Sequence, residues 1–234
     1  EIHERLVGSE MCIRDSDYAK SSLLGTDGDY SKEYSNYFSG EQGESPSSNS
    51  LYYWNKSTGK NTWSESNLNK INLNTNFVNN IGTIWAKKIA TTTWKVGGGT
   101  YANLRDAVPK TAYQYEVGSS ASTTTYDAKI GLMYVSDYYY SASPSAWTLV
   151  GYNSDYTKSY ASAKGENWLY GGGWDWTISR SSDDSDYAFR VSGVGFVRHN
   201  NVRVSFGVRP SFSLLSSTTY VSGSGSMSDP VRIN

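Results

Sequence analysis

The sequence predicts a domain that combines short helices with a small antiparallel sheet. Residues 187–191 and 202–208 alternate apolar and polar side chains, which is typical of strands with one buried face. Residues 62–65 (TWSE) have the spacing of a helix capping box, and apolar residues follow at helical intervals. The chain has 234 residues, enough for one large domain with tails or at most two small domains.

The N-terminal part of the chain is expected to lie outside this domain. Residues 1–16 are charged and aliphatic, hold the single cysteine and lack aromatic residues. They resemble a translated sequencing-adapter read-through, so we expect an artefactual segment; the alternative is a genuine short helix. Residues 17–50 are polar, which is typical of a linker or a truncated segment. The folded domain is therefore expected to span residues 51–234.

The first structured elements follow in order. Residues 51–54 predict a short strand, and 55–59 predict a turn that begins with a weak glycosylation sequon. A helix is expected from Thr62 as N-cap, with a second short helical turn over 77–81. Gly82 is a suitable stop for it.

The middle of the chain contains strand and helix signals separated by turn residues. Residues 84–96 favour a strand near their end, and the triple glycine that follows lacks the lysine of a phosphate loop. A short helix is expected over 103–108, ended by Pro109. Residues 129–136 are apolar on both faces, which predicts a buried central strand.

The C-terminal half contains an aromatic, Ser-rich excursion over 137–165 and a strand over 174–178. Tyr138–Tyr140 would place at least one tyrosine outward if they formed a strand. A three-stranded meander is then expected. Its strands are 187–191, 194–198 and 202–206, with turns at 192–193 and 199–201.

The apolar phases of these elements define the expected core. It comprises Ile130, Leu132, Val135, Trp168, Trp176, Ile178, Phe189, Val191, Val208 and Phe212. Trp174 is also expected in the core rather than as a sugar-stacking platform, because tryptophan mostly serves packing. Arg209 is expected to pair with a carboxylate such as Asp137 or Glu166.

Composition excludes several classes of function. The formal net charge is −1 with no polybasic run, which argues against nucleic acid and charged membrane surfaces as partners. No apolar stretch approaches the roughly 18 residues that span a bilayer, so we expect no membrane insertion by the region present. A single cysteine permits no internal disulfide, and we expect no cofactor and no metal. The 20 Tyr and 8 Trp are consistent with a binding surface, or simply with packing.

The polar phase of the meander is the expected binding surface, because rigid scaffolds place binding groups on loops and strand ends. His199, Asn200 and Asn201, in the second turn, would form the tip of this surface. The candidate ligand-binding residues are Asp184, Asp186, Tyr187, Arg190, Arg198, His199, Asn200, Asn201 and Arg203. The cluster of Asp183, Asp184 and Asp186 is interpreted first as a solvated turn. A weak cation site, a polar ligand contact and a carboxylate pair for catalysis remain alternatives.

Four segments, in this order, resemble a family of surface proteins from gut Firmicutes and wall-less relatives. They are 128–138 (AKIGLMYVSDY), 166–170 (ENWLY), 176–179 (WTIS) and 206–212 (FGVRPSF), and the ending at 222–233 is also similar. The resemblance covers residues 51–234. It implies an α+β, C-type-lectin-like fold in which two helices flank a small antiparallel sheet with long irregular loops. Family members often follow a pilin-like N-terminal segment, and related folds vary the strands just before the Gly-Val-Arg-Pro stretch.

The chain departs from better-known relatives of that fold. It lacks the Glu-Pro-Asn or Gln-Pro-Asp loop and the Trp-Asn-Asp strand of calcium-dependent sugar lectins. It also lacks the paired cysteines needed for chemistry like that of formylglycine-generating enzymes. We therefore expect a non-enzymatic, extracellular or cell-surface recognition or adhesion domain that binds a glycan or a protein. The alternatives are a structural pilin-like subunit or stalk domain, and a hydrolase that uses the aspartate cluster.

Overall fold

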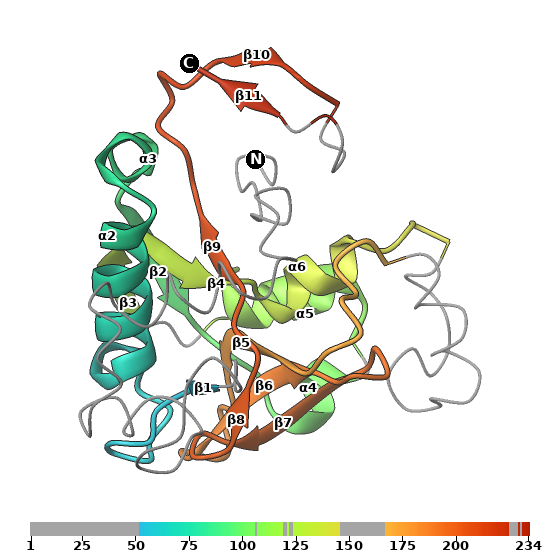
Figure 1. The fold of residues 1–234 in the computed structure, drawn as a ribbon. Helices are drawn as coiled ribbons and strands as arrows, with labels where there is room; N and C mark the ends of the chain where they lie inside the picture. The colour runs from blue at the N-terminus through green and yellow to red at the C-terminus, as the bar shows by residue number, and fades with distance from the viewer. Residues whose placement is uncertain are drawn as a thin grey trace.

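The computed structural model describes residues 52–105, 107–118, 121, 124–145, 167–224, 229 and 231–234. The expectations for residues 1–16 and 17–50, and for much of the excursion at 137–165, lie outside this part of the chain. The described residues form an α+β arrangement of short helices and small antiparallel sheets, as the sequence predicts (Figure 1).

The first described elements lead from a short strand into a column of helices along one side of the molecule (Figure 1). They are β1 (Tyr52–Tyr53), the 3-10 turn η3 (Trp63–Glu65), the π-helical segment η4 (Leu68–Phe77), α2 (Val78–Asn80) and α3 (Thr83–Lys88). Thr62 is the N-cap of η3 as expected, but its side chain makes no capping hydrogen bond. Gly82 separates α2 from α3 with a φ of 85°, a conformation that glycine adopts without steric cost.

The η4 segment buries one stripe of side chains against the sheet that holds β4. Leu68, Leu73 and Phe77 are fully buried, and their spacings of five and four residues exceed the 3.6-residue period of an α-helix. The side-chain amide of Asn74 pairs with Ile130 of β4 as the backbone of a neighbouring strand would. It accepts a hydrogen bond from the backbone N–H of Ile130 and donates one to the carbonyl of Ile130, each at 2.9 Å. This exchange docks the column onto the sheet and satisfies one strand residue completely.

The middle segment consists of a hairpin and two short helices. β2 (Thr92–Val96) pairs antiparallel with β3 (Thr124–Ala128), while α4 (Tyr101–Arg105) and α5 (Pro109–Glu116) lie between them in sequence. The expected helix over 103–108 is correct only in part: α4 covers its first half but ends at Arg105, and Pro109 begins α5 rather than ending a helix. Proline suits the first helical position, where its missing N–H would have no partner, and Val108 before it is extended.

The expected strand over 129–136 is correct only in part. β4 (Ile130–Leu132) pairs antiparallel with β9 (Pro210–Phe212), but α6 (Val135–Tyr140) begins three residues later. The backbone N–H of Tyr134 donates to the carboxylate of Asp137 at 2.9 Å, a capping contact that starts the helix. The tyrosine run therefore lies on a helix. The hydroxyl groups of its two buried members, Tyr138 and Tyr139, each donate to a backbone carbonyl at 2.6 Å.

The sheet that carries the candidate site has the order β5-β6-β7, all antiparallel. β5 is Asp175–Arg180, β6 is Tyr187–Val191 and β7 is Val197–Asn201. The first meander strand is confirmed, but the second begins at Val197 rather than at 194. The third expected strand leaves the sheet, and only β8 (Ser205–Phe206) is extended, paired with β1.

The displaced register follows from the turn between β6 and β7. The backbone N–H of Ser192 donates to the carbonyl of Phe196 at 2.8 Å, and Gly195 between them has a φ of 92°. This closes a longer loop than the two-residue turn that the sequence suggests: of the two glycines in this segment, Gly195 and not Gly193 adopts the left-handed conformation.

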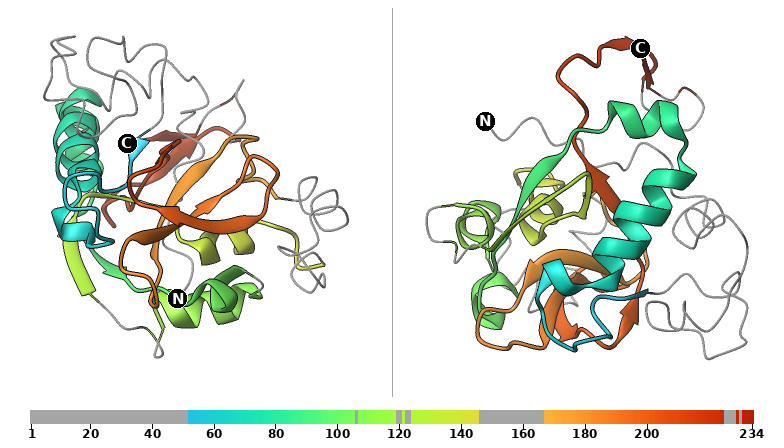
Figure 2. Two further views of the ribbon diagram at one scale, coloured as in Figure 1. Left: turned by 90° about the horizontal axis from the view of Figure 1, so that it is seen from below. Right: turned by 90° about the vertical axis from the view of Figure 1, so that its left-hand side faces the viewer.

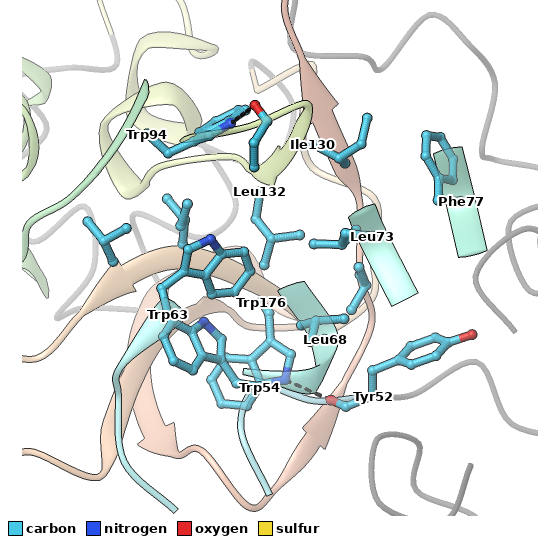
Figure 3. Close-up of a cluster of buried hydrophobic side chains, with 14 of the residues drawn as sticks. Tyr52, Trp54, Trp63, Leu68, Leu73, Phe77, Trp94, Ile130, Leu132 and Trp176 are labelled. Atoms are coloured by element: carbon cyan, nitrogen blue, oxygen red, sulfur yellow. Dashed lines mark hydrogen bonds between the residues drawn. The ribbon is translucent and has the colours of Figure 1, made fainter. Parts of the chain in front are cut away.

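Two buried clusters lie on the two sides of this sheet. The larger one surrounds Trp54, Trp63, Trp94 and Trp176 (Figure 3). The indole N–H of Trp176 donates to the carbonyl of Tyr52 at 2.8 Å, which ties β5 to β1 without leaving a buried donor unpaired. The smaller cluster gathers residues of α4, α5, α6, β6 and β7. All the expected core residues are buried except Trp168 and Trp174, which are 57% and 48% exposed.

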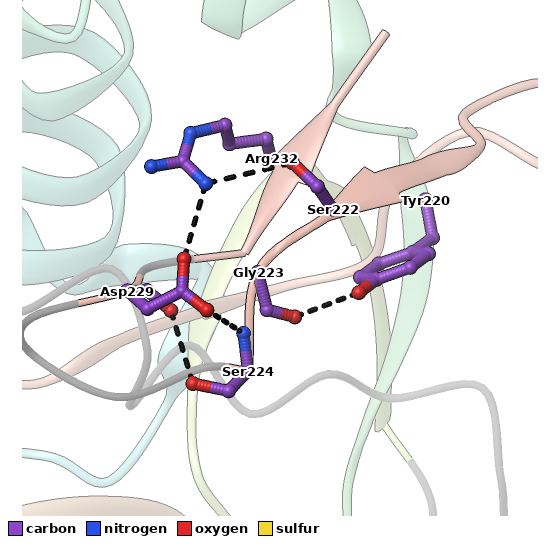
Figure 4. Close-up of polar contacts among 6 residues, drawn as sticks. All are labelled: Tyr220, Ser222, Gly223, Ser224, Asp229 and Arg232. Atoms are coloured by element: carbon purple, nitrogen blue, oxygen red, sulfur yellow. Dashed lines mark hydrogen bonds and ion pairs between the residues drawn. The ribbon is translucent and has the colours of Figure 1, made fainter.

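The described chain ends in a hairpin of β10 (Tyr220–Ser222) and β11 (Arg232–Ile233), which stands off from the sheets (Figure 1 and the right-hand view of Figure 2). Asp229 stabilises the hairpin through an ion pair with Arg232 at 3.1 Å and by accepting a hydrogen bond from the N–H of Ser224 at 2.9 Å (Figure 4). Among the described residues, none of the helices is long and apolar enough to cross a membrane.

Candidate functional site

The β5-β6-β7 sheet divides the expected site residues between its two faces. Arg190 lies opposite Arg198 in the register of β6 and β7, and Phe189 lies opposite His199. Because side chains alternate along a strand, Arg190, Arg198 and Asn200 share one face, and Tyr187, His199 and Asn201 share the other. The expected tip at 199–201 is wrong, since these residues form part of β7 rather than a turn.

We call the first of these surfaces the arginine face. It consists of Trp174, Arg190, Phe196, Arg198, Asn200 and Phe206. The backbone of Trp174 is held by Gly207, whose N–H donates to its carbonyl at 2.7 Å. The face is thus built on paired strands and a strand end, which keep its side chains in a defined arrangement.

Arg190 is the buried centre of the arginine face. It is only 4% exposed, so its expected place on a solvated phase is wrong. Its guanidinium carbon lies 4.0 Å from the ring centroid of Trp174 and 4.8 Å from that of Phe206. Its Nε donates to Oδ1 of Asn200 at 2.5 Å. The rings stabilise the cation, because the negative faces of aromatic systems attract guanidinium groups.

The charge of Arg190 is not neutralised by the residues that the structure describes. It forms no ion pair with any described carboxylate, and its Nη1 is buried without a hydrogen-bond partner. Burial, and then the charge of Arg198, lower the pKa of Arg190 to about 10, so it remains a cation at neutral pH. Burying an unpaired charge is costly, which makes this position unusual for a purely structural residue.

Arg198 supplies a second, exposed cation to the same face. Its guanidinium carbon lies 4.7 Å from the ring centroid of Phe196, two residues earlier in the chain. In the described part of the chain it, too, forms no ion pair with a carboxylate. Like charges directly opposite each other on a sheet are unfavourable, so the pairing of Arg190 with Arg198 has a cost that a bound anion would remove.

Trp174 gives the arginine face an exposed aromatic surface. It is 48% exposed, and its ring stacks on that of Phe206 with centroids 5.5 Å apart and planes at 28°. Its expected place in the core is therefore wrong. A Cβ atom at Gly193 would lie 2.5 Å from the indole nitrogen, so the glycine of the β6–β7 turn makes room for this ring.

The opposite face serves to attach α4. The His199 ring stacks on Tyr101 with centroids 4.3 Å apart and planes at 16°, and Tyr187 lies on it at 4.8 Å. Burial lowers the pKa of His199, which favours the neutral imidazole among these rings. Nδ2 of Asn201 donates to Asp186 at 2.8 Å. His199, Tyr187 and Asn201 are therefore engaged in packing on the opposite side of the sheet. They cannot contact the same ligand as the arginine face.

The aspartate cluster lies in the turn that precedes β6. A hydrogen bond with Asp186 raises the pKa of Asp184, and the same bond lowers the pKa of Asp186. Asp183 accepts from the hydroxyl of Ser181 at 2.7 Å. No group of three His, Cys, Asp or Glu residues suited to a metal is found within the described ranges. The cluster therefore has the local bonding of an Asp-rich turn.

Two further arginines lie away from the arginine face. Arg203 follows β7 and reaches toward the carbonyl of Thr58 at 3.5 Å. Nη2 of Arg209 pairs with Asp175 at 3.0 Å and its Nη1 donates to the carbonyl of Leu169 at 2.5 Å. Arg209 thus pairs with a carboxylate as expected, but the partner is Asp175 rather than Asp137 or Glu166.

Sequence reasoning placed Arg190, Arg198 and Asn200 in the site, and the structure brings these three together. It missed Trp174 and Phe196. The Gly171–Gly173 run just before Trp174 was the available signal, since glycines provide no side chains of their own to cover the following indole.

No protein-family model matches the chain, no curated protein matches it, and no solved structure matches its fold. Fold and site together define an α+β domain with an exposed tryptophan and two closely placed arginines on one face of a three-stranded sheet.

Proposed function

We propose that this chain is an extracellular or cell-surface recognition domain of C-type-lectin-like fold that binds a glycan or protein ligand without catalysis. In this proposal it belongs with the gut-bacterial surface proteins that its sequence resembles, and the arginine face is the binding surface. The half-exposed Trp174 ring beside Arg190 and Arg198 carries the proposal. Tryptophan and arginine are the residues that most often dominate binding energy at protein surfaces.

The setting of these side chains supports binding rather than a structural role. Trp174 stacks on the buried Phe206 ring and its backbone is bonded to Gly207, yet it remains 48% exposed, so its ring is held in place with a large part of its surface open to solvent. A fixed exposed aromatic ring can receive the face of a sugar or an apolar side chain at little entropic cost. Arg198 adds a charged donor within the same surface.

Catalysis has less support. The aspartates at 183, 184 and 186 lie before β6, whereas Arg190 and Trp174 lie at its other end. His199 is packed between Tyr101 and Tyr187, and burial lowers its pKa although the charge of Asp183 opposes this. Within the described residues it makes no hydrogen bond or ion pair with these carboxylates, as a general base working with them would.

The test is a glycan and surface-protein array probed with the domain and with single variants. Trp174→Ala and Arg198→Ala change exposed side chains of the arginine face, and each should reduce binding at least about tenfold. Trp168→Ala and Arg203→Ala are matched controls, since both residues are exposed but lie outside that face. The controls should bind as the parent does.

Two results would contradict the proposal. If a ligand is found and Trp174→Ala and Arg198→Ala bind it as well as the parent, the binding surface lies elsewhere. If neither array contains a ligand, a spacer role such as a stalk domain explains the chain better.

A further inference from the structure

We infer that the arginine face takes an acidic saccharide, with the carboxylate or sulfate group held by Arg190 and Arg198 and a sugar ring lying on Trp174. This inference rests on the proposed function and names the chemical class of its ligand. It is carried by three observations: a buried guanidinium nitrogen without a partner, a second arginine directly across the strands, and an exposed indole in contact with the first arginine.

The unpartnered guanidinium is the first observation. Arg190 is 4% exposed, and its Nε donates to Asn200 while its Nη1 is buried without a partner. The orientation of the group is set by that bond and by the Trp174 and Phe206 rings. A guanidinium that is already oriented and desolvated binds a planar or tetrahedral oxyanion well, because little freedom remains to be lost.

The second observation concerns charge balance. Arg198 lies directly across from Arg190, and its guanidinium packs on the ring of Phe196. It forms no ion pair with any described carboxylate. Asp175, which is paired with Val191 in the register of this sheet, is already bonded to Arg209. The face therefore carries two positive charges in a chain whose formal net charge is −1, which favours an anionic over a neutral ligand at this position.

The third observation distinguishes a saccharide from a simple anion. The Trp174 ring is 48% exposed and contacts Arg190, so a ligand whose anionic group meets the arginines has a flat apolar surface beside it. The apolar face of a sugar ring fits such a surface.

The experiment compares acidic saccharides with their neutral counterparts by calorimetry. The probes are trigalacturonate against its methyl ester, sialyllactose against lactose, and a sulfated heparin oligosaccharide against its desulfated form. Sodium acetate and sodium sulfate test the anion alone. We expect at least one acidic saccharide to bind about tenfold or more tightly than its neutral counterpart, and affinity should fall as salt is raised. Preference for trigalacturonate or sialyllactose would indicate a carboxylate ligand, and preference for the heparin oligosaccharide would indicate a sulfate.

Variants then assign the binding to the arginine face. Arg198→Ala should lose about tenfold in affinity for the acidic saccharide and none for its neutral counterpart, whereas Trp174→Ala should weaken both. Arg203→Ala and Trp168→Ala should change neither. Since Arg190 is buried, Arg190→Lys is included with a melting curve, and it should fold but bind less tightly than the parent.

Equal binding of acidic and neutral members of every pair would overturn the inference and leave the proposed function in place. The same holds if only a protein from the array binds the arginine face. Binding of acetate or sulfate as tight as that of the saccharide would remove the role of Trp174 and overturn the inference as well. Absence of any ligand in both experiments would overturn the inference and the proposed function together.

Discussion

The carboxylate of Glu116, the last residue of α5, accepts a hydrogen bond from the backbone N–H of Val135, the first residue of α6, at 2.9 Å. It also accepts from the N–H of Ser136 at 2.9 Å and from the hydroxyl of Ser179 on β5. The group is completely buried, and burial raises its pKa to about 7 although these hydrogen bonds oppose the rise. One carboxyl group thus joins two helices and the sheet.

Stability should therefore fall as the pH rises through neutrality. The unfolded chain releases the Glu116 proton near 4.5, but the folded chain holds it up to about 7. The stabilisation is fully present below pH 4.5 and is lost as the pH passes 7. Its size is on the order of 3 kcal/mol in the free energy of unfolding. Urea denaturation at a series of pH values from acidic to mildly alkaline measures it.

The control for this dependence is Glu116→Gln, which cannot titrate. It should lower stability at acidic pH, because an amide nitrogen faces an N–H donor, but its stability should change less with pH than that of the parent. An identical pH profile for the variant and the parent would show that another group is responsible.

Gly131 should not tolerate a side chain. A Cβ atom there would lie 2.6 Å from Cε3 of the buried Trp94, whose indole N–H also donates to the carbonyl of Ala128 at 3.1 Å. Gly131→Ala should lower the free energy of unfolding by about 1–3 kcal/mol, because a packed ring must shift. Gly173→Ala is the matched control. Its Cβ would meet nothing closer than 4.0 Å, so its melting temperature should match or slightly exceed that of the parent.

Asn61 should be important for the turn that holds the aspartate cluster. Its Nδ2 lies 2.9 Å from the carbonyl oxygens of Ser181 and Asp184 and 2.8 Å from that of Tyr187. Asn61→Ala should cost about 2–3 kcal/mol, since it removes three hydrogen bonds and takes the donor from the buried carbonyl of Ser181, whereas the carbonyls of Asp184 and Tyr187 keep backbone partners. Thermal unfolding measures this loss. Asn79→Ala, at an exposed position on α2, should remain within about 0.5 kcal/mol of the parent; an equal loss in both would show that the Asn61 contacts are not the cause.

Two ion pairs in the described part of the chain should differ in strength. The side chains of Arg209 and Asp175 are 27% and 14% exposed, whereas those of Arg232 and Asp229 are 57% and 48% exposed. Arg209→Ala should destabilise by about 2–3 kcal/mol because it leaves a largely buried carboxylate unpaired. Arg232→Ala should cost less than about 1 kcal/mol. Chemical denaturation of both variants compares them, and similar losses would contradict the assignment.

Metal removal should leave the melting temperature unchanged. The oxygens of Asp184 and Asp186 are engaged with each other and with Asn201, rather than converging with other ligands on one point. Scanning calorimetry with EDTA and with added calcium tests this. A calcium-dependent rise of several degrees would make Asp183, Asp184 and Asp186 metal ligands.

Local sequence pattern was sufficient to predict the mixture of helices and strands, the strand at β6 and nearly all of the core. Alternation of apolar residues, as at Phe189 and Val191, reports directly on which side chains leave water, because burial of apolar surface dominates the stability of a strand. The same pattern brought Arg190, Arg198 and Asn200 into one candidate site.

The face that each residue occupies, and the tryptophans that remain exposed, depend instead on contacts between segments distant in sequence. The turn at Ser192–Phe196 moved the start of β7 by three residues, and an odd shift exchanges the two faces of a strand, so His199 packs inward beside Tyr101. Trp174 and Trp176 have the same phase, yet one is 48% exposed and the other is fully buried. They differ because β1 covers Trp176, whereas Trp174 lies at the surface over Arg190 and Phe206 with a glycine of the β6–β7 turn beside it. The periodicity within β5 does not indicate any of these neighbours.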